Sequence, residues 1–124
     1  MKLRVRLALL CSLLAPGLAA AHAVLTKSEP APRAQLASAP AAVRLWFNEP
    51  LEAAFCAASV LDDAGHEVSR EPARVSAQER KLLELALPAL PAGQYTVRYQ
   101  VLSIDGHTVK GSFVFRLKDR AAPK

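Results

Sequence analysis

Residues 94–101 read Gln94-Tyr95-Thr96-Val97-Arg98-Tyr99-Gln100-Val101, and apolar and polar side chains alternate through the whole stretch. Side chains of an extended strand point to opposite faces in turn, so an alternation of period two is typical of a strand with one face in a core. Tyrosine and valine also favour strands. The stretch therefore predicts a half-buried β-strand, with its odd-numbered residues inside.

The same alternation recurs along the chain between turn-forming residues such as Asn48-Glu49-Pro50 and Asp62-Asp63-Ala64-Gly65. It predicts further strands at Val43–Phe47, Leu83–Leu87 and Phe113–Leu117, a weaker one at Phe55–Leu61, and an edge strand at Ala23–Thr26. About seven short strands at this spacing predict an all-β, Greek-key sandwich of two antiparallel sheets. The composition of residues 76–85 is also compatible with a helical turn, although Pro88 favours a loop followed by a strand.

The first 21 residues have the composition of an export signal. Basic residues precede an apolar run, Leu7–Leu14, which is too short to span a bilayer, and Ala19-Ala20-Ala21 offers a small-residue cleavage site. We therefore expect a signal peptide at residues 1–21 and one mature domain at residues 22–124, located in the periplasm. A lipoprotein anchored through Cys11 is the alternative, which the bulky Leu10 disfavours.

The whole-chain charge of +5 overstates how basic the mature protein is, because Lys2, Arg4 and Arg6 leave with the signal. A mildly basic domain without a concentrated basic patch is a poor match for nucleic acid. We also expect no stable membrane insertion and a monomer. Cys56 is the one cysteine outside the signal, so no disulfide within the mature chain is expected, and its alternation with Ala58 and Val60 favours a buried small hydrophobe over a ligand.

His22 becomes a two-nitrogen metal ligand if cleavage follows Ala21, because its α-amine and imidazole can then close a chelate ring. An α-amine has a pKa of about 7.7 to 8.0, so a metal can displace its proton near neutral pH. Asp105 and His107 supply a carboxylate and a second imidazole. If the strand remained extended through Gly106, both side chains would leave one face of it.

Together these donors make a nitrogen-rich, tetragonal set, which suits one Cu(II) ion better than zinc. Glu49 is a candidate outer ligand or hydrogen-bond partner. Each element also has an ordinary interpretation: the terminal histidine depends on the cleavage point, and Asp-Gly-His can be a simple turn. We expect His66 to be a surface residue.

The chain resembles the CopC family of periplasmic copper-binding proteins over essentially the whole mature region. The residues that carry the resemblance are His22-Ala23-Val24-Leu25, Ser28-Glu29-Pro30-Ala31, Val43-Arg44-Leu45-Trp46-Phe47-Asn48-Glu49-Pro50, Gly93-Gln94-Tyr95-Thr96-Val97, and Ser103-Ile104-Asp105-Gly106-His107 with Gly111 and Phe113. One departure is Arg33, which stands near a position where the family often has glycine and puts the conformation of that loop in doubt.

The resemblance implies an immunoglobulin-like or cupredoxin-like Greek-key sandwich or barrel. It also implies that His22 and His107 are the nitrogen ligands of Cu(II), with Asp105 as an adjacent ligand and Glu49 as a weaker one. Some members carry a methionine-rich loop for Cu(I), but Leu61–Glu67 stands in its place here, and Met1 is the only methionine. We therefore expect no dedicated Cu(I) site.

Three classes of function remain open from the sequence. The first is a non-catalytic copper carrier in homeostasis or resistance, which passes its ion to an inner-membrane partner of the CopD type. The second is a copper monooxygenase, since a terminal histidine and a second histidine also form the brace of such enzymes; the small domain and the carboxylate beside the metal speak against it. The third is a sandwich interaction module that binds no metal.

Overall fold

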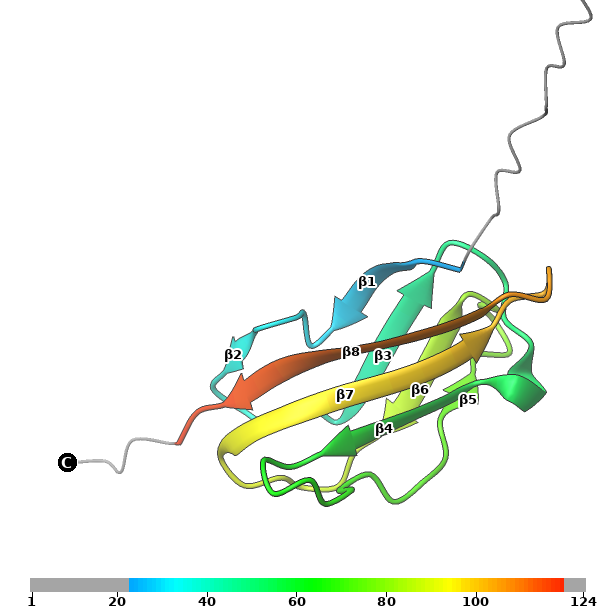
Figure 1. The fold of residues 1–124 in the computed structure, drawn as a ribbon. Coiled ribbons are helices and arrows are strands. Elements are labelled where there is room, and N and C mark those ends of the chain that lie inside the picture. Colours follow the sequence, from blue (N-terminus) through cyan, green and yellow to red (C-terminus); the bar gives the residue numbers. More distant parts are fainter. Residues whose placement is uncertain (1–22, 120–124) are drawn as a thin grey trace, which may run out of the picture.

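The structure, a computed structural model, describes residues 23–119 as a sandwich of two four-stranded sheets (Figure 1). The first sheet has the order β1-β3-β6-β5, with β1 at Leu25–Glu29, β3 at Ala42–Phe47, β5 at Arg74–Val75 and β6 at Leu82–Ala86. The second has the order β2-β8-β7-β4, with β2 at Gln35–Leu36, β4 at Ala57–Leu61, β7 at Gly93–Leu102 and β8 at Thr108–Leu117. The predicted all-β sandwich is confirmed.

The differences from the prediction concern two strand boundaries and the shortest elements. The edge strand β1 lies at Leu25–Glu29 rather than at Ala23–Thr26, and β8 begins at Thr108 rather than at Phe113. Residues 23–119 form eight strands rather than about seven, because β2 and β5 are two residues long and too short to carry a periodic pattern. The strand β2 also pairs in parallel with β8, through Gln35 opposite Arg116, so the second sheet is not purely antiparallel. Residues 76–81 form a loop with turns before β6, as Pro88 suggested, and a short 3-10 helix, η1 (Ala53–Phe55), replaces the start of the weak strand.

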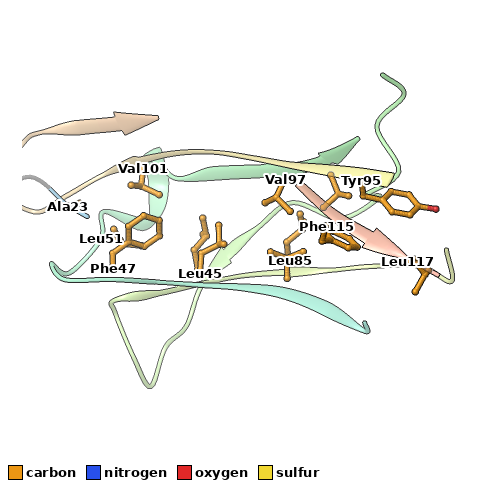
Figure 2. Close-up of a cluster of buried hydrophobic side chains, with 13 residues drawn as sticks. Ala23, Leu45, Phe47, Leu51, Leu85, Tyr95, Val97, Val101, Phe115 and Leu117 are labelled. Atoms are coloured by element: carbon orange, nitrogen blue, oxygen red, sulfur yellow. The ribbon is translucent and has the colours of Figure 1, made fainter. Parts of the chain in front are cut away.

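The core lies between the sheets and is made by the alternating residues of the long strands. Val43, Leu45 and Phe47 of β3 face Val97 and Val101 of β7, and all five are at most 2% exposed. Figure 2 shows that Ala23, Leu51, Phe47 and Val101 fill one end of this core and that Tyr95 and Leu117 lie at the other. Removing such side chains from water is the main source of folding free energy.

The loop at Arg33, which departs from the family pattern, has an unusual backbone conformation. Its φ angle is 63°, a left-handed conformation that glycine adopts more readily than arginine. The backbone is held there because the Arg33 N–H donates to the carbonyl of Val114 at 2.6 Å.

Within residues 23–119, no helix is long and apolar enough to cross a membrane. The expected signal at residues 1–21 and the terminal residue His22 lie outside the described residues.

Candidate metal centre

Residues 103–107 form the turn between β7 and β8 and carry two of the predicted ligands. The N–H of Ser103 donates to the carbonyl of His107 at 3.0 Å, and the N–H of Gly106 donates to the carbonyl of Ser103 at 2.9 Å. Gly106 has a φ of 91°, which a residue with a side chain rarely adopts. Of the two alternatives that the sequence left open here, the chain therefore forms a turn and does not continue as an extended strand.

The turn nevertheless brings Asp105 and His107 together. Oδ1 of Asp105 accepts a hydrogen bond from the backbone N–H of His107 at 3.1 Å and lies 3.1 Å from Nδ1 of the imidazole. The hydroxyl of Ser103 donates to the same oxygen. An aspartate that binds the backbone two residues ahead is a common way to close a turn. Here the turn geometry fixes a carboxylate against an imidazole.

These contacts also control the charge of Asp105. The hydrogen bond from Ser103 is the largest cause that holds the pKa of Asp105 below its usual range, partial desolvation opposes it, and the hydrogen bonds and charge of His107 lower it further. Asp105 is therefore an anion at neutral pH. The recorded contacts of this carboxylate within residues 23–119 all fall on Oδ1.

The orientation of His107 suits a metal ligand. When Nδ1 carries the proton and donates it to Asp105, the lone pair of Nε2 points away from the carboxylate. Histidines that bind metals usually have such a partner on the other ring nitrogen, which fixes the ring and its tautomer. The side chain of His107 is 46% exposed, so an ion can reach it from solvent.

The first described residues are fixed by Asn48, which follows β3. The N–H of Val24 donates to Oδ1 of Asn48 at 2.6 Å, and the N–H of Asn48 donates to the carbonyl of Val24 at 3.0 Å. Ala23 is 1% exposed and belongs to the core. The sequence pattern predicted Asn48 only as part of a turn; an asparagine at a strand end, whose side chain can bind the backbone, was the available signal.

The Asn48–Glu52 loop is in turn bonded to the β7–β8 turn. Leu51 and Ser103 form an isolated antiparallel bridge, and the N–H of Ile104 donates to the carbonyl of Pro50 at 3.1 Å. Figure 1 shows the start of β1, the helix η1 and the β7–β8 turn at the same end of the sandwich. Three segments that are distant in sequence thus converge where Asp105 and His107 lie.

The other residues singled out by the sequence are placed as follows. Glu49 is half-buried in the loop after β3, and its side chain has no hydrogen bond or ion pair to another residue of the range 23–119. His66 is a surface residue, as expected, with Nδ1 3.8 Å from Oδ2 of Asp62 beyond the far end of β4. No group of three or more potential metal-binding side chains occurs within residues 23–119, a range that does not include His22.

Cys56 is half-buried beside η1 and packs against the core. Its thiol donates to the carbonyl of Glu52 at 3.2 Å and lies 3.8 Å from the carbonyl of Leu102. Burial raises the pKa of this thiol, the carbonyl contact of Leu102 opposes the rise, and the charge of Glu52 adds to it. A protonated thiol is a poor ligand and nucleophile, which agrees with the structural role expected for Cys56.

Comparison with known proteins gives one consistent result. The CopC domain family model matches residues 25–118. Protein YobA of Escherichia coli K12 is 38% identical over 117 residues, which cover 94% of each chain. The copper transport protein CutJ of Bacillus subtilis is 33% identical over 98 residues, which cover 78% of this chain but 18% of CutJ.

The fold agrees with a solved structure as well. The crystal structure of CopC from Methylosinus trichosporium OB3b superposes with a TM-score of 0.77 at 33% identity, and the match covers 83% of this chain and all of that one. The arrangement of the sheets is therefore shared with a protein that has been solved by experiment.

Proposed function

The chain belongs to the CopC family, and from this membership we propose that it is an exported, non-catalytic protein that carries one Cu(II) ion in the periplasm. Residues 1–21 are the signal, and residues 22–124 are the copper-binding domain. The ligands are the α-amine and imidazole of His22, the imidazole of His107 and the carboxylate of Asp105. Its role is in copper homeostasis or resistance.

The observation that carries this proposal is the convergence at one end of the sandwich. Ala23 is buried in the core there, and the two hydrogen bonds between Val24 and Asn48 fix the direction in which the chain arrives. Consecutive Cα atoms are about 3.8 Å apart, so His22 is tied closely to Ala23. The described chain thus begins at the end of the sandwich that carries the β7–β8 turn, which supports a terminal chelate shared with His107.

The donor set supports Cu(II) over other ions. Three nitrogens and a carboxylate oxygen suit a tetragonal site, and Cu(II) is the tightest-binding divalent ion of its row for such ligands. Asp105 can coordinate through Oδ2 while Oδ1 keeps its hydrogen bonds from the Ser103 hydroxyl and the backbone N–H of His107, provided that the imidazole of His107 rotates away from Oδ1 so that Nε2 reaches the same ion. Glu49, from the loop next to the turn, is the outer ligand or hydrogen-bond partner. A dedicated Cu(I) site is not expected, because residues 22–124 contain no thioether.

Carriage is proposed over catalysis because of Asp105. An oxygen-activating copper centre needs an open position for oxygen, and a fixed anion next to His107 competes for that position. The recipient of the ion is proposed to be an inner-membrane transporter of the CopD type. CutJ supports this step, since a region similar to this chain makes up 18% of a longer copper transport protein.

Electron paramagnetic resonance of the mature protein with one equivalent of Cu(II) tests the proposal. A tetragonal spectrum with nitrogen couplings is expected, and His107→Ala should remove one nitrogen and weaken binding about 10- to 100-fold or more. His66→Ala is the matched control, because this exposed histidine lies beyond the far end of β4 and should leave the spectrum unchanged. A spectrum that changes with His66→Ala but not with His107→Ala would refute the site.

A further inference from the structure

All the large apolar side chains that are exposed within residues 23–119 lie at one end of the sandwich. Val24 is 54% exposed, Phe55 is 66% exposed and Ile104 is 50% exposed. Val24 precedes β1, Phe55 ends η1 and Ile104 belongs to the β7–β8 turn. Figure 1 shows these three segments at the same end. We call these three residues the apolar rim.

The rim is set firmly in place although its side chains are outside the core. The backbone of Ile104 is bonded to Pro50, that of Val24 is bonded to Asn48, and the N–H of Glu52, just before η1, donates to the carbonyl of Leu102 at 2.8 Å. A single exposed apolar residue is ordinary on a protein surface. Three of them at one end, on segments whose backbones are hydrogen-bonded to neighbouring segments, point to an interaction site, because exposed apolar surface that is gathered in one place marks such sites.

We propose that the apolar rim is the surface through which this protein docks onto the copper transport protein that receives its ion. This inference rests on the proposed function, because Ile104 directly precedes the ligand Asp105 and Val24 follows His22 by two residues. A partner seated on the rim covers the copper site at the same time. The ion can then move between donors of the two proteins without release to solvent.

The charges near the rim favour a protein partner over the alternatives. The carboxylates of Glu49, Glu52 and Asp105 come from the same segments as the rim, whereas the cations Arg80 and Lys81 belong to the neighbouring loop before β6. Carboxylates beside the rim repel anionic lipid headgroups. A symmetric dimer built on this patch would place the same carboxylate-bearing surface on both sides of the interface. A partner face with apolar pockets and basic residues is complementary to them.

CutJ also supports this kind of partner. In CutJ a region similar to this chain is covalently part of a longer copper transport protein. For a separate domain, a docking surface has to replace the covalent link. Aromatic side chains are enriched among the residues that dominate binding energy at interfaces, which makes Phe55 the expected anchor.

Photo-crosslinking in the cells that produce the protein tests the inference. A photoreactive amino acid replaces Phe55 or Ile104 in two variants and Ala37 in a control, which is exposed and follows β2 at the opposite end of the sandwich. Mass spectrometry of the products should identify a copper transport protein from positions 55 and 104, and not from position 37. Crosslinks to a second copy, to lipid or to no protein, or equal crosslinking from position 37, would overturn the inference.

A second measurement separates this inference from the proposed function. The variant Phe55→Ser should bind Cu(II) in titrations as the unchanged protein does, because Phe55 is not a ligand and lies outside the β7–β8 turn that carries Asp105 and His107. Its affinity for the crosslinked partner should fall at least about tenfold, as expected when anchor residues are truncated. If the variant keeps its full affinity for the partner, the docking surface alone is overturned. If the unchanged protein does not bind Cu(II), the proposed function is overturned.

Discussion

Asn48 and Val24 exchange two hydrogen bonds at the end of β3, with donor–acceptor distances of 2.6 Å and 3.0 Å. The pair connects the chain's first described residues to the loop that is bonded to the β7–β8 turn. In the proposed copper site Asn48 is therefore a positioning residue and contributes no ligand.

Replacing Asn48 should therefore weaken copper binding. In Asn48→Ala the N–H of Val24 loses its acceptor and the segment after His22 is less constrained, so we expect the Cu(II) affinity to fall about tenfold, as for other residues that support metal ligands. Asn48→Asp keeps the acceptor oxygen and should retain most of the affinity. Competition titration with a chelator measures both, and equal affinity of the alanine variant would contradict the positioning role.

Removing the hydroxyl of Ser103 should raise the pKa of Asp105. The pKa of this carboxyl is lowered mainly by that hydrogen bond, so Ser103→Ala should move it toward its ordinary value. A carboxyl with a lowered pKa stabilises the fold at pH above its unfolded pKa, and this contribution is lost as the pH falls through the folded pKa. In Ser103→Ala the folded pKa lies closer to the unfolded pKa, so this contribution is smaller and its loss is complete at a higher pH. Carbon-detected NMR titration of Asp105 reads the shift, and an unchanged pKa would contradict it.

Gly111 should not tolerate a larger side chain, because a Cβ there would collide with Oη and Cζ of Tyr99 and would lie 2.9 Å from its Cε1. Tyr99 packs edge-on against Phe47, with ring centroids 5.6 Å apart, so its ring cannot move away freely. We expect Gly111→Ala to lower the free energy of unfolding in urea by about 1 to 3 kcal/mol, as overpacking usually does. Ser112→Ala, on the exposed face next to it, is the control and should change little.

Cys56 should react slowly and leave copper binding unaffected. Burial raises its pKa, so less thiolate is present at pH 8 than for an unhindered cysteine, and alkylation by iodoacetamide should be slow until urea unfolds the chain. Because the folded pKa is raised, the stability that this group contributes is present at low pH and is lost as the pH rises through the folded pKa. Cys56→Ser should keep the Cu(II) affinity, and a large loss would make the thiol a ligand.

The alternation of side chains was enough to predict the long strands, because β3, β6, β7 and β8 each place one face in the core. It was not enough for β2 and β5, whose two residues depend on neighbouring strands. It also failed at Gly106, where a left-handed backbone angle and the side chain of Asp105 close a turn instead of continuing the strand. Hydrogen bonds within a turn leave no periodic pattern in the sequence.

The donors of the candidate site could be chosen from their chemistry, but their arrangement could not. The contact of Asp105 with His107 follows from residues two apart in a turn, which the sequence left as one of two alternatives. The link from Val24 through Asn48 and Leu51 to Ser103 joins segments that are far apart in the chain, and alternation within each segment contains no information about such contacts. Asn48 was missed for that reason.

The central claim is that the free amine of His22 is a copper ligand, and extending the chain by one residue tests it most directly. Cu(II) titration compares the protein that begins at His22 with one that has a single alanine in front of it, since an amide nitrogen in place of the amine breaks the chelate ring. We predict that the extended protein folds with the same circular dichroism spectrum and binds Cu(II) at least about 100-fold more weakly. Equal affinity of the two proteins would contradict the account.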